Sequence, residues 1–143
     1  MSRFALASLL TLCLISSAQA ANPIEEENQK PGALDWQLTR VRVDGSNYRS
    51  TWVEGYCSKQ SVSAGDSIDI MISADPPRPV KVEIFRTGYY DGRGARLMKT
   101  IEPIDCSPQP TPKPGPKDLH ECHWKPSTSL TIPDDWVSGV YLG

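Results

Sequence analysis

Apolar residues recur at every second position over much of the chain from residue 51 onward, a period of two that is typical of β-strands with one buried face. The clearest runs are residues 67–73 and 80–84, and the proline-rich segment 75–79 separates them. The apolar positions are Ile68, Ile70 and Ile72 in the first run and Val80, Val82 and Ile84 in the second. We predict that these two strands pair as sequential antiparallel neighbours.

Further extended runs are predicted at 51–57, at 96–101, at 127–132 and from 139 onward. No stretch of ten or more residues shows the i, i+3, i+4 spacing of a helix. Short strands with frequent turns favour an all-β fold, namely an antiparallel β-sandwich over residues 51–143. A seven-stranded sandwich needs about 100 residues. We therefore expect a sandwich truncated before its last strands, with a reading frame that continues beyond Gly143.

The segment 88–95 (GYYDGRGA) holds three glycines and an aspartate, which is the composition of a tight turn. Tyr89 and Tyr90, with Arg93 and Arg96 nearby, are candidates for an exposed interaction surface that binds a carbohydrate or another domain. The other interpretation is that one tyrosine packs inward and caps the sandwich while the glycines adopt positive φ. We favour this second interpretation.

A proline stands at every second position in residues 107–117, five times in all. Each proline fixes φ near −65° and lacks an N–H donor, so this segment is predicted to be an extended spacer and not a strand. We interpret it as a long surface crossover between the two sheets. A recognition tract is the less favoured interpretation, because the segment lacks a Pro-x-x-Pro register.

Residues 1–20 have the pattern of a signal peptide: a short positive start, an apolar stretch over 4–15 and small residues before a cleavage site after Ala20. We expect an exported protein, secreted or periplasmic, with no membrane contact after cleavage. A lipoprotein acylated at Cys13 is disfavoured by the bulky Leu12 before it. Residues 21–50 are predicted to be an extended lead-in that could include a peripheral strand around 36–43, because 22–32 carries three glutamates and few apolar residues.

The composition excludes several classes of protein. At 143 residues the chain has room for one domain after its leader. Its 15 Lys and Arg residues are scattered among 17 Asp and Glu residues, which argues against a nucleic-acid partner. We find no catalytic residue pattern and expect no bound cofactor. The cluster 120–123 (HECH) is not expected to hold a metal, because adjacent residues of an extended chain point to alternate faces.

Three cysteines remain after cleavage: Cys57, Cys106 and Cys122. Export permits a disulfide, and the odd number leaves one thiol free or paired outside the chain. Loop closure stabilises by about 3 kcal/mol for a short loop and about 4 kcal/mol for a longer one, a difference too small to choose the partner of Cys122.

Four motifs carry a family resemblance. They are the segment 22–38, the EGYCS of 54–58, the FRTGYYDGRGARL of 85–97 and the IPDDW…SGVY of 132–141. In their order they resemble secreted bacterial proteins of the N,N-dimethylformamidase large (beta) subunit-like family. The resemblance covers essentially the whole mature chain, and it is most specific in the turn motif.

The resemblance implies that this chain is the N-terminal portion of such a protein, an immunoglobulin-like sandwich ahead of a larger domain. The iron site of the true amidases, built from tyrosines and a glutamate, lies in that later domain. No residue of this chain matches it, so Tyr89 and Tyr90 are not iron ligands. The resemblance also favours a Cys57–Cys122 disulfide over one that involves Cys106.

Two functions follow as expectations. The first is a non-catalytic module of an exported amidohydrolase-like protein, which docks against a downstream domain of the same polypeptide; full-length relatives could be amide hydrolases. The alternative is a free-standing extracellular binding or adhesion module for cell-envelope polysaccharide or protein.

Overall fold

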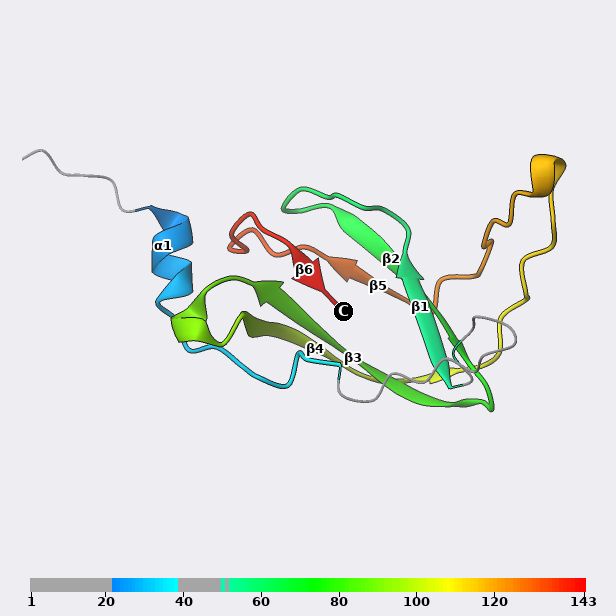
Figure 1. The fold of residues 1–143 in the computed structure, drawn as a ribbon, viewed down its shortest axis with the longest axis horizontal. Helices are drawn as coiled ribbons and strands as arrows, with labels where there is room; N and C mark the ends of the chain where they lie inside the picture. The colour runs from blue at the N-terminus through cyan, green and yellow to red at the C-terminus, as the bar shows by residue number, and fades with distance from the viewer. Residues whose placement is uncertain (1–21, 39–49, 51) are drawn as a thin grey trace, which may run out of the picture.

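The computed structural model describes residues 22–38, 50 and 52–143, and its centre is a pair of facing three-stranded antiparallel sheets (Figure 1). One sheet has the strand order β1-β2-β5 and the other the order β4-β3-β6. The strands are β1 (Val53–Cys57), β2 (Ser67–Ala74), β3 (Arg78–Thr87), β4 (Ala95–Cys106), β5 (Thr128–Thr131) and β6 (Tyr141–Leu142). The predicted all-β sandwich class is confirmed.

The strands β2 and β3 follow each other in the chain but lie in different sheets, which corrects our prediction that they pair. β2 is bonded to β1 and β5, whereas β3 is bonded to β4 and β6. The connection contains Pro76 and Pro77, which lack the N–H donors that a hairpin ladder would use. Alternation reveals that a strand has a buried face, but it does not identify the strand beside it.

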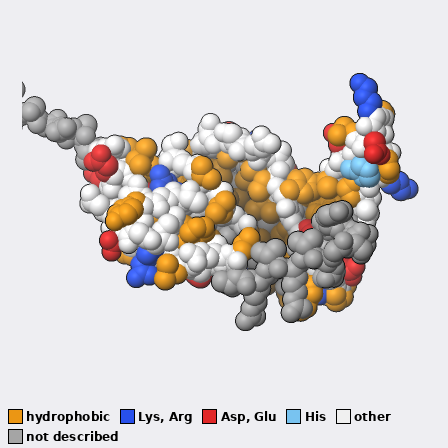
Figure 2. All heavy atoms as spheres, in the orientation of Figure 1, with side chains coloured by type: hydrophobic (Ala, Val, Ile, Leu, Met, Phe, Trp, Pro, Cys, Tyr) orange, Lys and Arg blue, Asp and Glu red, His pale blue; other side chains and the backbone are white. Residues whose placement is uncertain are grey.

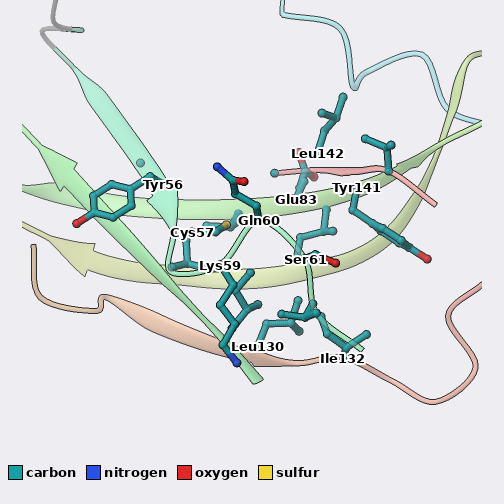
Figure 3. Close-up of a pocket in the computed structure, with 18 of the residues that line it drawn as sticks. Tyr56, Cys57, Lys59, Gln60, Ser61, Glu83, Leu130, Ile132, Tyr141 and Leu142 are labelled. Carbon is teal, nitrogen blue, oxygen red and sulfur yellow. The ribbon is translucent and has the colours of Figure 1, made fainter. Parts of the chain in front are cut away.

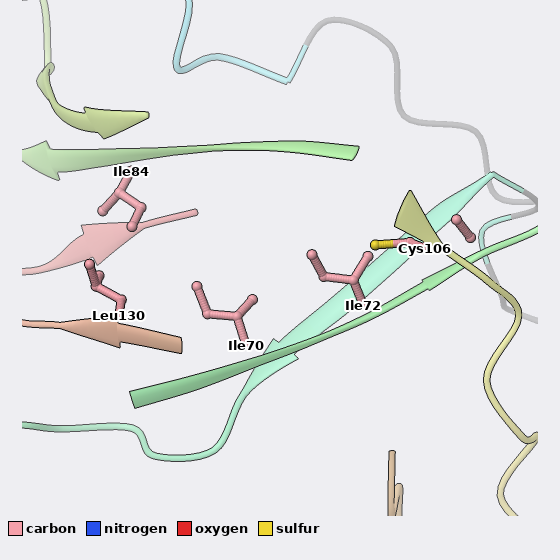
Figure 4. Close-up of a cluster of buried hydrophobic side chains, with 6 residues drawn as sticks. Ile70, Ile72, Ile84, Cys106 and Leu130 are labelled. Carbon is pink, nitrogen blue, oxygen red and sulfur yellow. The ribbon is translucent and has the colours of Figure 1, made fainter. Parts of the chain in front are cut away.

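The hydrophobic core lies between the two sheets (Figure 4). It is made by the inward-facing side chains of β2, with contributions from β3, β4 and β5. Its buried members are Ile70, Ile72, Ala74, Ile84, Cys106 and Leu130. Burial of each large aliphatic side chain contributes about 1.5–3 kcal/mol, so the alternating isoleucines of β2 are a main source of stability.

The lead-in is not extended where we expected it to be, because residues 23–28 form the helix α1 (Pro23–Asn28). The side chain of Asn22 caps the helix by accepting a hydrogen bond from the backbone N–H of Ile24 at 3.0 Å. Pro23 occupies the first turn, where a missing N–H does no harm, and Glu25 and Glu26 complement the helix dipole. Local capping interactions thus form a helix in a segment whose composition had predicted no ordered structure.

Residues after α1 pack against the start of β4. Ala33 forms an isolated bridge with Ala95, and Trp36 Nε1 donates a hydrogen bond to the carbonyl of Arg93 at 2.9 Å. The predicted signal peptide and most of the predicted peripheral strand lie outside the described residues.

The proline-rich segment 107–117 lies in the connection that runs from β4 in one sheet to β5 in the other. Gln109 anchors its base, because the Gln109 backbone N–H donates to Ser73 Oγ at 2.9 Å and its side chain donates to the carbonyl of Lys125 at 2.8 Å. A short 3₁₀ turn, η2 (Pro116–Asp118), lies at the protruding end (Figure 1).

The glycine-rich turn between β3 and β4 contains the 3₁₀ turn η1 (Tyr90–Gly92), which lies beside α1 (Figure 1). Gly92 and Gly94 have φ of +77° and +87°, where a side chain is strained. A Cβ on Gly92 would meet nothing within 4 Å, but a Cβ on Gly94 would lie 2.8 Å from Cζ2 of Trp36.

We predict that Gly92→Val lowers the free energy of unfolding by about 1–2 kcal/mol, which is the penalty of a left-handed backbone alone. Gly94→Val should be more destabilising, because the valine would also displace Trp36. Denaturant unfolding of the two variants measures the difference. The matched control is Lys99→Val, which adds valine at an exposed strand position that suits it. Variants at Gly92 and Gly94 that unfold like the parent would contradict the turn geometry.

Candidate functional site

The glycine-rich turn places the four candidate interaction residues in different environments. Tyr89 is 68% exposed and Arg93 is exposed, so both can contact a partner. Tyr90 is fully buried, which removes it from any exposed surface. Arg96 is turned toward Glu27, and its guanidinium lies 2.6 Å from the carboxylate. The inward tyrosine is the arrangement that we favoured from the sequence.

A buried polar network joins α1 to the turn; we call it the Glu27 network, and its members are Glu27, Lys30, Arg86, Tyr90 and Arg96. The Glu27 side chain is 1% exposed. Its Oε1 accepts from Arg96 at 2.6 Å and from the Tyr90 hydroxyl at 3.2 Å, and its Oε2 accepts from Lys30 at 2.6 Å. Arg86 in turn donates to the Tyr90 hydroxyl at 2.9 Å. The carboxylate is therefore fully satisfied although it is buried.

Arg86 extends this network to the segment before β6. It is 3% exposed, and it donates to the carbonyls of Val137 at 3.2 Å and Ser138 at 2.8 Å. Tyr141 in β6 donates its hydroxyl to the same Val137 carbonyl at 2.6 Å. The rings of Trp136 and Tyr141 stack with centroids 4.9 Å apart. The position of β6 is thus tied through Arg86 to α1.

The Glu27 network changes the acidity of its members. Burial alone would raise the pKa of Glu27, but hydrogen bonds from Lys30 and Arg96 and the charge of Arg96 outweigh it and lower the pKa below its ordinary value. Burial raises the pKa of the Tyr90 hydroxyl, and the Arg86 hydrogen bond only partly opposes this. At neutral pH Glu27 is therefore ionised and Tyr90 is a neutral donor.

Sequence reasoning did not identify Glu27 and Arg86 as site residues. One signal was available, because the pattern Asn-Pro-x-Glu-Glu at 22–26 is a helix start, and it would have placed Glu27 on a helix. No signal in the sequence indicated that this glutamate meets Arg96, which is 69 residues away.

The second feature is a groove between the two sheets, with a cavity volume of about 880 Å³. We call it the inter-sheet groove. Its walls are the inner faces of β1 and β2 on one side and of β3 and β6 on the other, and the loop after β1 forms its rim (Figure 3). Apolar side chains line the hollow at the centre of the face seen in Figure 2. Its apolar lining includes Val53, Ile68, Val80, Val82, Ile132 and Leu142.

The inter-sheet groove leaves inward-facing positions of β1 open to solvent. Val53 is 39% exposed, and Gly55 and Cys57 are also exposed, although all three line the groove. By contrast, Ile70 and Ile72 on the neighbouring strand are buried. The sandwich is thus closed over β2 and open over β1.

The three described cysteines are free thiols, so the Cys57–Cys122 disulfide stays a prediction. Tyr56 donates to the carbonyl of Cys122 at 3.2 Å, whereas the adjacent Cys57 points to the opposite face of β1 and lines the inter-sheet groove. In the β1–β2 ladder Cys57 lies opposite Ile70, and Ala74 is four residues farther along β2. The backbone N–H of Ala74 donates to the carbonyl of Ser107, the residue after Cys106. At about 3.3 Å per residue, Cys57 and Cys106 lie too far apart for a disulfide.

Tyr90 and Glu27 are of the residue types that bind iron in the true amidases, and their oxygens lie 3.2 Å apart. Three cationic side chains, Lys30, Arg86 and Arg96, already donate to these oxygens. An iron ion would face those like charges at close range, so the pair does not fit one. Within the described ranges no group of three His, Cys, Asp or Glu side chains is placed to hold a metal.

The helices in the part of the chain that the structure describes are too short to cross a membrane.

We predict that Glu27→Gln lowers the free energy of unfolding by about 1–3 kcal/mol at pH 7, because the amide cannot satisfy three donors. The folded pKa of Glu27 lies below 4.5, so the network stabilises above that pH and its contribution is lost as the pH falls through the folded value. Glu27→Gln should therefore flatten the acid limb of a stability–pH curve. Glu26→Gln, an exposed neighbour on α1, is the control and should leave that limb unchanged.

We also predict that Cys106 resists alkylation until the protein unfolds, because it is 4% exposed and burial raises the pKa of its thiol. Peptide mapping of the unreduced protein should show no disulfide at Cys106, and the disulfide that the family resemblance favours would be found as a linked Cys57–Cys122 pair. Native alkylation of Cys106 would contradict its burial, and separate alkylation of Cys57 and Cys122 would remove the disulfide.

Comparison with known families accounts for the C-terminal part of the chain. Residues 81–143 match the family model described as N,N-dimethylformamidase beta subunit-like, C-terminal. The match begins within β3 and includes the glycine-rich turn and all later strands. No curated protein and no solved structure matches the chain. Residues 81–143 are therefore similar to the C-terminal part of N,N-dimethylformamidase beta subunit-like proteins, which confirms the resemblance over this part of the chain.

Proposed function

We propose that this chain is a non-catalytic β-sandwich module of an exported N,N-dimethylformamidase-like protein, and that it docks against a larger domain of the same polypeptide. The larger domain would carry the catalytic groups and any iron. The observation that carries the proposal is the inter-sheet groove, an apolar surface of a kind that marks an interface when it is left open. The family match supplies the amide-hydrolase context.

The roles of the charged residues support a structural function. The buried charged residues Glu27 and Arg86 belong to one closed hydrogen-bonded network. Their hydrogen bonds go to backbone carbonyls and to neighbouring side chains. Among the described residues we identify no nucleophile that lies beside a general base. His120 and His123 have exposed side chains and lie beside Asp118 and Glu121. The Glu27 network therefore positions α1 and the segment before β6, and we assign it no role in activating a substrate.

We predict that the chain alone does not hydrolyse N,N-dimethylformamide, with or without added iron, and that it has low solubility because its groove is open. It should co-purify with the larger region of an N,N-dimethylformamidase beta subunit-like protein when the two are co-expressed. Val53→Asp, which places a charge in the open part of the groove, should abolish co-purification. The amount of the chain that an affinity pull-down of the larger region retains measures the loss of co-purification.

The control is Leu119→Asp, which adds the same charge at a residue that is 56% exposed next to η2 and far from the groove lining. It should co-purify like the parent. Amide hydrolysis by the chain alone would overturn the non-catalytic role, and loss of co-purification in both variants or in neither would overturn docking through the groove.

One observation favours the alternative, an extracellular binding module for envelope polysaccharide or protein. Tyr56 and Trp124 form a tilted aromatic pair with centroids 5.4 Å apart, beside Pro112 and His120, on the outer face of β1. Aromatic faces with polar edges suit sugar rings. A soluble, cooperatively melting monomer that binds polysaccharide and ignores the larger region would favour this alternative.

A further inference from the structure

A second pocket lies on the outer face of β1, at the base of the segment that protrudes from the sheets in Figure 1. We call it the aromatic pocket. Tyr56 and Trp124 line it as a tilted pair of rings with centroids 5.4 Å apart, together with Pro112 of the proline-rich connection. Its volume is about 810 Å³, and all of its lining residues lie between Glu54 and Trp124 in the chain.

The polar groups of both rings are bonded within the chain. The Tyr56 hydroxyl donates to the carbonyl of Cys122 at 3.2 Å and accepts from the backbone N–H of Trp124 at 3.0 Å. Trp124 Nε1 donates to the carbonyl of Pro110 at 2.8 Å. The two rings are therefore fixed before any ligand arrives, so a ligand that stacks on them does not have to order their side chains. These rings offer a ligand their faces and not their hydrogen bonds.

The aromatic pocket is also lined by the polar residues Glu54, Thr111 and His120. No lysine or arginine is among its described lining residues. A carboxylate or phosphate group in the pocket would therefore meet the charge of Glu54 with no cation there to offset it. The lining favours a neutral ligand that combines apolar faces with hydroxyl groups.

A cationic ligand fits this pocket less well. Enclosing a quaternary ammonium group requires ring faces directed at the cation from more than one side. Tyr56 and Trp124 instead lie against each other, at the spacing of a packed aromatic pair, and leave no room for a cation between them. A pyranose ring needs only an open aromatic surface, because its axial C–H groups form flat apolar sides and its equatorial hydroxyls lie at the rim.

We propose that the aromatic pocket binds a neutral pyranose ring of a polysaccharide, which stacks on the Tyr56–Trp124 pair with its hydroxyls toward Glu54 and Thr111. The inference rests on the second of the proposed functions and specifies its site and its ligand class. It does not depend on docking through the inter-sheet groove, because the Tyr56 ring points away from that groove (Figure 3).

The first test compares two hexamers that differ only in charge. One is cellohexaose, a neutral chain of β-1,4-linked glucose, and the other is the β-1,4-linked hexamer of glucuronic acid. Fluorescence anisotropy of hexamers labelled at the reducing end measures binding to the full chain. We expect cellohexaose to bind about tenfold more tightly. Glu54→Gln removes the charge but keeps an acceptor for the Ser50 N–H, and it should reduce this difference.

The second test removes one ring face. Trp124→Ala should weaken cellohexaose binding about tenfold or more. The matched control is Trp52→Ala, because Trp52 is 59% exposed and lies outside the lining of the aromatic pocket; this variant should bind like the parent. Tyr56→Phe keeps both rings but loses the hydroxyl bonds, and it should bind within about threefold of the parent.

Cellohexaose should also slow amide hydrogen exchange at 120–125 in the parent chain and leave 80–84, in the inter-sheet groove, unchanged. This measurement decides if Trp124→Ala does not fold. Absence of cellohexaose binding, equal binding of both hexamers, or protection at 80–84 alone would overturn the proposal. Equal losses in Trp124→Ala and Tyr56→Phe would also overturn it, because the pair would then act by anchoring the connection and not by stacking.

The outcome is separable from those of the proposed functions. Binding of the glucuronic acid hexamer without cellohexaose rejects the neutral ligand and leaves a polysaccharide-binding module. Binding of neither hexamer with retained co-purification rejects this site and leaves the docking function. Binding of cellohexaose without co-purification supports the site and rejects docking through the inter-sheet groove.

Discussion

The arrangement of the strand ends depends on the hydrogen bonds that the buried guanidinium of Arg86 donates. Arg86 ties β3 to the carbonyls of Val137 and Ser138, and through the Tyr90 hydroxyl it reaches the carboxylate of Glu27. A charge buried away from water is stable only because hydrogen-bond partners surround it. The helix α1, the glycine-rich turn and the approach to β6 are therefore fixed relative to one another by a single polar cluster.

Much of the fold could be predicted from local patterns. The isoleucines of β2 and the valines of β3 alternate so regularly that the strands were identified close to their observed bounds. Gly92 and Gly94 indicated a turn with positive φ, and both have it. These features depend on neighbours in sequence, so a single chain carries enough information to find them.

The features that were missed depend on partners distant in the chain. Whether β2 pairs with β3 is decided by how two sheets stack, and alternation is the same in either arrangement. Glu27 looked like one of three solvated glutamates, yet its partners on β4 and in η1 make it the most buried carboxylate of α1. The inter-sheet groove likewise follows from the spacing of two sheets, which no run of residues encodes.

The charges on β3 have a consequence for how two copies of the chain meet. Charged residues on a strand edge usually keep copies apart, but Lys81 and Glu83 flank Val82 symmetrically, so the charges of two antiparallel copies are complementary. Salt screens exposed charges, so this complementarity between two copies weakens as the ionic strength rises.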